Sequence, residues 1–267
     1  MNRFMDDRYL LTGDTAYALF ESVRSLPIYD YHCHLVPREI REDRRFDDIG
    51  TLWLEADHYK WRLMRAAGLP ERLVTGDASP DEKFLAFASV LPLAAGSPVY
   101  HWAHLELKTF FGINEPLNPA SAPAILAEAN RQMQSGSFTA RSLMTRSNVK
   151  VVCTTDDPAD NLEHHIALAD EGFAVRVCPT FRPDRAVCGL LRPDFAEYVR
   201  TITGIASGPI AFGEWLEALE ARLTFFYDNG CRVSDLSLTA LPAKTGTPAE
   251  ARAAFDRAMT GKADPAD

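Results

Sequence analysis

The chain has 267 residues, 46% of them hydrophobic, and a formal net charge of −9. This size and composition suit one large α/β domain with a substantial core. The negative charge argues against nucleic acid or an anionic membrane as the partner, because both are bound by basic surfaces. No apolar run is long enough to span a bilayer and the charged start does not fit a secretory signal, so we expect a cytoplasmic protein.

The first half of the chain is predicted to be mainly helical around one early strand. Asp14 is interpreted as the N-cap of a helix that runs to about Ser25, and a strand follows at residues 28–34. A long helical insertion comes next, at residues 36–148. Its expected helices are 51–67, 81–90, 98–111, 123–134 and a shorter one that ends at Arg146.

The rest of the chain alternates short apolar strands with helices. The expected strands are 149–154, 173–179 and 231–235, and the expected helices are 161–171, 194–203, 214–229 and 247–262, before a polar tail that ends at Asp267. This alternation predicts a parallel sheet with right-handed crossovers. The four expected strands are half of an eight-stranded barrel. Either the sheet closes in another way or the chain is the N-terminal portion of a larger enzyme.

The five cysteines are an odd number without C-x-x-C spacing, which indicates neither a disulfide framework nor a cysteine zinc site. All but Cys188 fall in expected strands. We interpret these four as small buried side chains, which is the commonest role of a free cysteine.

The residues that best indicate chemistry are His32 and His34, in the segment L-P-I-Y-D-Y-H-C-H-L-V. In a strand they share one face, so both imidazoles can bind one divalent ion. Alternatively the H-x-H pair is a chance occurrence, with one ring capping a loop and the other solvated. The position at the end of an apolar strand favours a metal site, because barrel enzymes hold their chemistry at that rim.

A second histidine pair, His101 and His104, lies on an expected helix. Its three-residue spacing also allows metal binding. The favoured interpretation is that both are ordinary helix-face residues that pack with Trp102, because no carboxylate or cysteine completes a ligand set.

A longer series of motifs resembles the uronate isomerase (glucuronate isomerase) family of the amidohydrolase superfamily, whose members are metal-bearing (β/α)8 barrels. The matching stretches occur in order over most of residues 4–235: H-C-H, L-W-L-E-A-D-H-Y-K-W-R-L-M-R-A-A-G, P-V-Y-H-W-A-H-L-E-L-K-T-F-F-G-I, C-T-T-D-D-P-A-D, P-T-F-R-P-D-R and F-F-Y-D-N-G-C-R-V-S-D. One H-x-H alone would be weak evidence, but this ordered series is strong.

The resemblance implies an aldose–ketose isomerase of hexuronate catabolism, which converts D-glucuronate to D-fructuronate and D-galacturonate to D-tagaturonate. His32 and His34 then correspond to metal ligands, with zinc the expected ion. His58 and Tyr59 match the motif that reaches over the sugar, and Arg182 matches the arginine that binds the substrate carboxylate. Without the resemblance, the favoured interpretation of Tyr59 is a core residue of an amphipathic helix, and that of Arg182 is a loop-packing residue.

The chain also departs from the family pattern. Leu236 follows Asp235 where the family has a histidine, and the family's later histidine and Asp-x-Arg motif do not occur. We therefore expect residues 1–267 to be the N-terminal portion of one (β/α)8 TIM-type barrel, with about four βα units and the insertion 36–148. Open sheet edges predict a homo-oligomer, and two histidines without their carboxylate predict weak metal binding and little turnover by the chain alone.

Two alternatives remain from the sequence. The first is a metal-dependent hydrolase of the same superfamily. The second is a non-catalytic fragment that acts as an assembly module through its open sheet edge.

Overall fold

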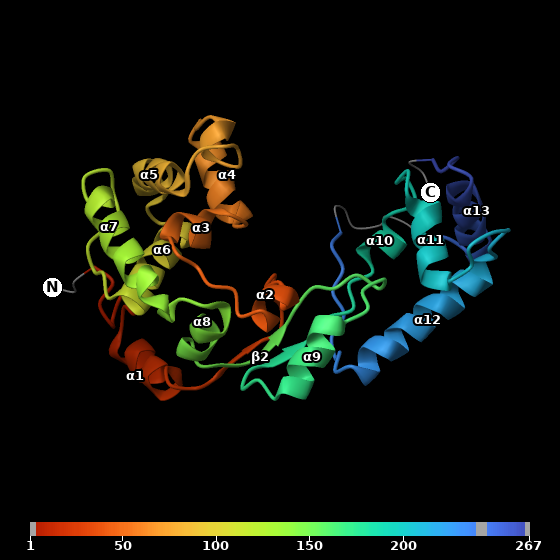
Figure 1. Ribbon diagram of the computed structural model, residues 1–267, viewed down its shortest axis with the longest axis horizontal. Helices are drawn as coiled ribbons and strands as arrows, with labels where there is room; N and C mark the ends of the chain where they lie inside the picture. The colour runs from red at the N-terminus through yellow and green to blue at the C-terminus, as the bar shows by residue number, and fades with distance from the viewer. Residues whose placement is uncertain (1–3, 239–244, 265–267) are drawn as a thin grey trace. The chain divides into compact units, whose positions relative to one another are not determined.

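The computed structural model describes residues 4–238 and 245–264 (Figure 1). The chain is a mixed α/β protein that divides into two compact units. The first contains Met1–Leu26 and Asp43–Arg146, and the second contains Pro27–Glu42 and Ser147–Asp267. The last three residues of the expected polar tail lie outside the described residues.

The first unit is helical. Its α-helices are α1 (Asp14–Val23), α3 (Ile49–Leu54), α4 (His58–Ala66), α5 (Pro80–Val90), α6 (Pro98–Phe111), α7 (Ala122–Gln132) and α8 (Ala140–Arg146). Two 3-10 turns, Glu71–Leu73 and Leu91–Ala94, and a π-turn at Met133–Ser137 connect them. Trp53 of α3 contacts Phe84 and Phe87 of α5 at ring-centroid distances of 5.8 and 6.1 Å, and these buried rings centre the core.

The expected single helix 51–67 is wrong, because the chain breaks it into α3 and α4. The carboxylate of Asp57 caps α4 by accepting hydrogen bonds from the backbone N–H groups of Tyr59 at 2.9 Å and Lys60 at 3.1 Å. An aspartate that bonds to N–H groups two and three residues ahead favours a helix start over a helix interior. His58 and Tyr59 therefore lie in the first turn of α4.

The predicted cap of α1 is also wrong by one residue. Gly13 is the N-cap and makes no side-chain cap hydrogen bond, while Asp14 lies in the first helical turn. The Asp14 carboxylate instead accepts a hydrogen bond from the guanidinium of Arg8 at 3.1 Å. A carboxylate in the first turn still interacts favourably with the helix dipole.

His104 has a structural role, as expected for a helix-face residue. Its buried ring donates from Nδ1 to the carbonyl of Tyr100 at 2.7 Å and accepts at Nε2 from the Leu117 N–H at 2.9 Å. The ring of His101 contacts the rings of Tyr9 and Tyr100.

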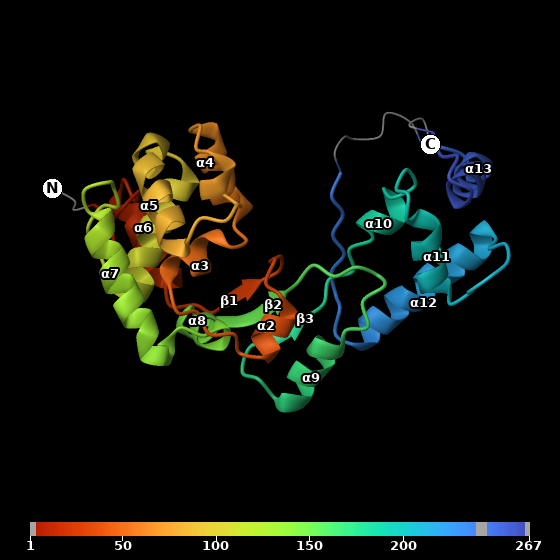
Figure 2. The same ribbon diagram turned by 45° about the horizontal axis from the view of Figure 1, so that its top comes forward.

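The second unit is built on a three-stranded parallel sheet of order β1-β2-β3 (Figure 2). The strands are β1 (Ile28–Asp30), β2 (Val149–Cys153) and β3 (Arg176–Cys178). Beyond β3, Phe181 makes parallel bridges to Asp156 on one side and Ser234 on the other. The fourth expected strand is thus reduced to a bridge at Ser234.

The first expected strand is shorter than residues 28–34, since β1 ends at Asp30. The Asp30 carboxylate accepts a hydrogen bond from the His32 N–H at 3.3 Å, which bends the chain in an Asx-type turn. The ladder resumes at one point, where the Cys33 N–H donates to the Cys153 carbonyl at 2.9 Å. His32 and His34 lie beyond the end of β1, so the alternation of a regular strand does not set the directions of their side chains.

The cysteines differ in part from expectation. Cys153 and Cys178 end β2 and β3, but Cys33 and Cys231 lie outside the named strands. All five lie in the described residues and are free. Burial raises the pKa of the Cys33 thiol to about 11, so this thiol is protonated and fills space at neutral pH.

The helices of the second unit are α2 (Pro37–Arg41), α9 (Glu163–Glu171), α10 (Asp184–Val187), α11 (Phe195–Thr203), α12 (Phe212–Asp228) and α13 (Pro248–Met259). Figure 1 shows α11, α12 and α13 gathered together, and their buried aromatic rings, Phe195, Tyr198, Trp215 and Phe255, form a common cluster. The short α2 and α10 were not expected, because five or four residues carry no helical periodicity. Within the described ranges, every helix is too short or too polar to cross a bilayer.

The first prediction concerns His104. Burial lowers its pKa, against the raising effect of its hydrogen bond to the Tyr100 carbonyl. A histidine in an unfolded chain has a pKa of about 6.5, so the folded state binds this proton less well. The stability contributed by His104 is fully present above that value and is lost as the pH falls through the lower folded pKa, at up to about 1.4 kcal/mol per pH unit.

Amide hydrogen exchange of the α6 backbone between pH 7.5 and pH 5, corrected for intrinsic rates, measures this effect. His104→Gln is expected to remove part of the loss of protection seen at low pH, and the control His101→Gln is expected to retain it. An unchanged pH dependence in His104→Gln would contradict the assignment.

Candidate active site

Two sequence-predicted residues, His32 and Arg182, come together at the carboxyl edge of the sheet. The backbone of Phe181 links two chain segments there: its N–H donates to Val233 O and its carbonyl accepts from the Asp235 N–H, each at 3.2 Å. Parallel strands end at the same edge, so the residues that follow them meet. This pairing brings Arg182 next to Asp235, and His32 reaches the same carboxylate from the segment after β1.

Asp235 joins the two predicted residues. Its Oδ2 atom lies 3.5 Å from Nδ1 of His32 and 2.9 Å from Nη1 of Arg182. The contact between Arg182 and Asp235 is an ion pair without the geometry of a hydrogen bond. Oδ2 of Asp235 is buried and accepts no hydrogen bond within the described residues. We did not predict Asp235 as a site residue. Its place at the end of an expected strand, where barrel sites lie, was the signal that could have identified it.

Arg182 also pairs with a second carboxylate. Its Nε donates to Oδ2 of Asp184 at 2.9 Å, and Oδ1 of Asp184 accepts from the Ser237 N–H at 2.8 Å. The arginine side chain is 23% exposed. A guanidinium held by two carboxylates is fixed in position and partly neutralised. An incoming anion must therefore compete with Asp184 and Asp235 for its N–H groups.

His32 and His34 have rings 5.0 Å apart between centroids, at an interplanar angle of 87°. Two imidazoles on one tetrahedral zinc have centroids about 5 Å apart, given a Zn–N bond of about 2.0–2.1 Å. The separation of the two ring centroids equals this value. Within residues 4–238 and 245–264, however, no three His, Cys, Asp or Glu side chains are arranged to hold a metal.

His58 and Tyr59 belong to the first unit. Their rings stack at 4.9 Å and 27°, and the Tyr59 ring meets Trp102 edge-on at 6.0 Å. Tyr59 is 51% exposed, so it is not the core residue that its helix position also allowed. The Tyr59 side chain is therefore accessible from solvent.

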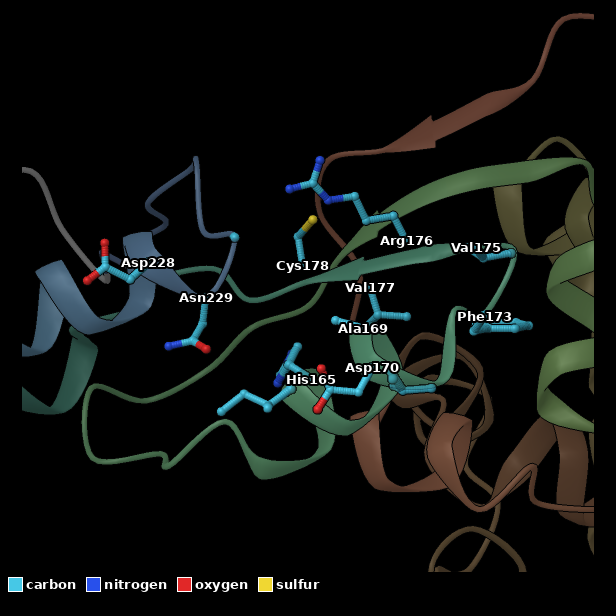
Figure 3. Close-up of a pocket in the computed structure, with 13 residues that line it drawn as sticks. His165, Ala169, Asp170, Phe173, Val175, Arg176, Val177, Cys178, Asp228 and Asn229 are labelled. Carbon is cyan, nitrogen blue, oxygen red and sulfur yellow. The ribbon is translucent and has the colours of Figure 1, made fainter.

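A pocket of about 440 Å³ lies elsewhere in the second unit, between α9, β3 and the end of α12 (Figure 3). Arg176 and Cys178 extend from one side of β3, whereas Val177 points from the other side towards His165 of α9. None of the predicted site residues lines this pocket. Convergent functional groups, rather than volume, therefore identify the candidate site.

A buried polar network fixes the segment after β2. The Thr154 hydroxyl lies 2.7 Å from Oδ2 of Asp156, to which it donates, and 2.8 Å from Nε2 of His165. The same Asp156 oxygen accepts from the Thr180 N–H at 3.0 Å. Burial raises the pKa of Asp156 and lowers that of His165, in each case against their mutual attraction. The stretch C-T-T-D-D-P-A-D contains Thr154 and Asp156, and its sequence alone predicts no role for either residue.

The network bears on the candidate site through the backbone. The Asp156 N–H donates to Thr180 O at 3.2 Å, and the Arg182 N–H donates to Asp156 O at 3.0 Å. Asp156 thus holds the residues on both sides of Phe181 through side chain and backbone together. This geometry can bind an anion at Arg182 beside an imidazole pair that suits a divalent ion.

Comparison with known proteins identifies the family. The sequence model of glucuronate isomerase matches residues 1–266. The chain belongs to the glucuronate isomerase family. The uronate isomerase of Caldanaerobacter subterraneus subsp. tengcongensis is 45% identical over 263 residues, which are 97% of this chain and 56% of that protein. The uronate isomerase of Bacillus subtilis is 45% identical over 264 residues, which are 98% of this chain and 56% of that protein.

Solved structures of the family agree with the fold. The uronate isomerase of Thermotoga maritima superposes with a TM-score of 0.90 at 34% identity, covering 97% of this chain and 57% of that one. The glucuronate isomerase of Caulobacter crescentus gives 0.83 at 26% identity, covering 94% and 54%. The chain thus spans a little over half the length of these family members.

The second prediction tests the buried network. Thr154→Val keeps the side-chain shape but removes the hydroxyl between Asp156 and His165, so two buried polar groups lose a partner. We expect a loss of about 1–3 kcal/mol in the free energy of unfolding, measured by urea denaturation. The matched control is Thr155→Val on the same segment, for which we expect a much smaller change. Equal effects of the two substitutions would contradict the role given to Thr154.

Proposed function

We propose that this chain forms part of a uronate isomerase, which converts D-glucuronate to D-fructuronate and D-galacturonate to D-tagaturonate. The observation that carries the proposal is the gathering of His32 and Arg182 around Asp235 in a chain of the glucuronate isomerase family. An anion-binding arginine beside a pair of metal-binding imidazoles suits a sugar acid, whose carboxylate and hydroxyl oxygens need different partners.

The proposed fold is the first portion of a (β/α)8 barrel, with about four βα units and the helical insertion 36–148. The parallel order β1-β2-β3 and the parallel bridge at Ser234 support it, because barrel strands pair in chain order. The high TM-scores against two solved isomerases support it as well.

Arg182 is the proposed binding residue for the substrate carboxylate. Its planar fork suits two carboxylate oxygens, and an acidic chain needs such a local cation to hold an anion. The present carboxylate partners, Asp184 and Asp235, keep the guanidinium oriented before the substrate arrives.

His32 and His34 are the proposed ligands of one divalent metal ion, with zinc our first choice. Bound there, the ion would supply Lewis acidity that stabilises negative charge on a sugar oxygen. The separation of the two ring centroids supports this assignment.

Tyr59 and His58 are the proposed acid–base and substrate-binding residues. Isomerisation moves a proton between two neighbouring carbons, so a side chain must accept and return it. The hydroxyl of the exposed Tyr59 can donate to a sugar oxygen, and a histidine can move a proton near neutral pH. Their stacked rings support a joint role.

We further propose a cytoplasmic protein that binds a small uronic acid and forms a homo-oligomer. The five free cysteines suit a reducing compartment. The exposed Tyr29 and Tyr31, at 66% and 79% exposure next to the β1 edge, suit a protein interface. The hydrolase and assembly-module alternatives gain no support from these relatives.

The third prediction is a complementation assay. The chain is co-expressed with the part of the Bacillus subtilis isomerase that the match does not cover, and conversion of D-glucuronate is measured. We expect turnover by the complex and little by the chain alone, because no three metal-ligating side chains come together among its described residues. Arg182→Lys is expected to raise KM by about 10- to 100-fold, as lost charged hydrogen bonds do.

Arg192→Lys is the control, because this exposed arginine pairs with Asp194 away from Asp235. A stable, purified complex that turns over neither uronate would contradict the proposed function. Equal KM values for both arginine variants would contradict the role of Arg182.

The fourth prediction concerns the metal. Zinc titration of the full chain by calorimetry is expected to show one weak site, which His32→Asn or His34→Asn weakens about tenfold or more, as loss of a ligand-set residue does. His164→Asn is the control, since this ring lies beside Glu163 on α9. Unchanged zinc affinity in both ligand variants would exclude this pair as the site.

A further inference from the structure

A cluster of charges around one buried lysine underlies the first turn of α4. The Lys60 side chain is only 6% exposed, and its Nζ lies 2.7 Å from Oδ2 of Asp57 and 3.8 Å from Oε2 of Glu106. The ammonium also lies 5.2 Å from the centre of the Trp53 ring. Within the described residues, this is a lysine held between two carboxylates and an aromatic face.

Asp57 uses its two oxygens for different tasks. Oδ1 caps α4 through the Tyr59 and Lys60 N–H groups, while Oδ2 accepts from the Lys60 ammonium. Burial acts to raise the pKa of Asp57, but attraction to Lys60 and these hydrogen bonds outweigh it, so the pKa is lowered. The cap is therefore an ionised carboxylate at neutral pH, held in place by the lysine.

The helix α6 contacts the same turn through two residues. Trp102 and Glu106 are four positions apart and share one face of α6. Trp102 meets the ring of Tyr59, and Glu106 meets the ammonium of Lys60. One helix face thus contacts two consecutive residues of α4, one by an aromatic edge and one by charge.

We propose that Lys60 and Glu106 are positioning residues, which lock the first turn of α4 against α6 and so fix the directions of His58 and Tyr59. The inference rests on the proposed function only in giving His58 and Tyr59 a role in the reaction. The lock itself follows from contacts within the first unit.

The chemistry of the cluster supports a positioning role over a purely stabilising one. An apolar residue of similar length could fill the Lys60 position without the cost of burying a charge. Burial raises the pKa of Glu106, more than the attraction to Lys60 lowers it, so its ionised form is costly there. The charged groups make directional contacts that an apolar side chain cannot make. Together, Asp57, Lys60 and Glu106 fix the spacing of the α4 N-terminus, the Lys60 side chain and α6.

The experiment is 19F NMR of the full chain labelled with 3-fluorotyrosine, with the Tyr59 signal assigned by its loss in Tyr59→Phe. Lys60→Met and Glu106→Gln are expected to shift and broaden the Tyr59 signal, and Lys60→Arg to restore most of its position. Lys83→Met on α5 and Glu128→Gln on α7 are matched controls that should leave it unchanged. The other tyrosine signals, Tyr198 among them, report whether each variant is folded.

A folded Lys60→Met and a folded Glu106→Gln with an unchanged Tyr59 signal would overturn the inference, whatever the uronate assay gives. If Lys60→Met does not fold, Glu106→Gln alone decides. In the complemented enzyme, Lys60→Met is expected to lower kcat, whereas Arg182→Lys raises KM. Shifted Tyr59 signals with no uronate turnover by any complex would leave the lock standing and remove the proposed function instead.

Discussion

The candidate site depends on the backbone pairing of Phe181. This residue continues the parallel sheet past β3 by joining Asp156 on one side to Ser234 on the other. Its own ring is buried and contacts Phe226 of α12 edge-on at 5.3 Å, which ties the pairing to a helix. Arg182 and Asp235 each follow a residue of this bridge. Backbone hydrogen bonds therefore bring these two residues next to each other, whatever rotamers their side chains adopt.

The candidate site centres on a positive charge although the net charge of the molecule is negative. The chain carries a net charge of −9, yet the candidate site centres on the guanidinium of Arg182. Two carboxylates hold that cation, and the imidazole of His32 approaches one of them. Such a site is oriented in advance, and an anionic substrate gains affinity only by improving on contacts that the protein already makes. Recognition of a sugar acid would therefore depend on geometry more than on net attraction.

Much of the helical architecture could be predicted because residues close together in the sequence determine where a helix begins and ends. The expected 81–90 and 98–111 nearly coincide with α5 and α6, where Ser79 and Ser97 cap the starts and Gly112 ends α6 at a φ of +68°. The break at Asp57 was missed because the surrounding residues are good helix formers, and one capping carboxylate decided otherwise. The site was predicted only in part: Arg182 and His32 came from motifs, while Asp235 required knowledge of which distant segment pairs with Phe181.

The proposed metal ion at His32 and His34 would lie beside the guanidinium of Arg182. Paramagnetic relaxation in NMR tests this placement, with Co²⁺ added to the chain and the arginine Nε–H signals observed. We expect strong broadening of the Arg182 signal, because His32 and Arg182 contact the same Asp235 oxygen at 3.5 and 2.9 Å. Arg222 of α12, which binds the carbonyls of Pro158 and Asp160, serves as the internal reference. Broadening of Arg222 without Arg182, or of neither at saturating Co²⁺, would exclude a metal ion beside Arg182.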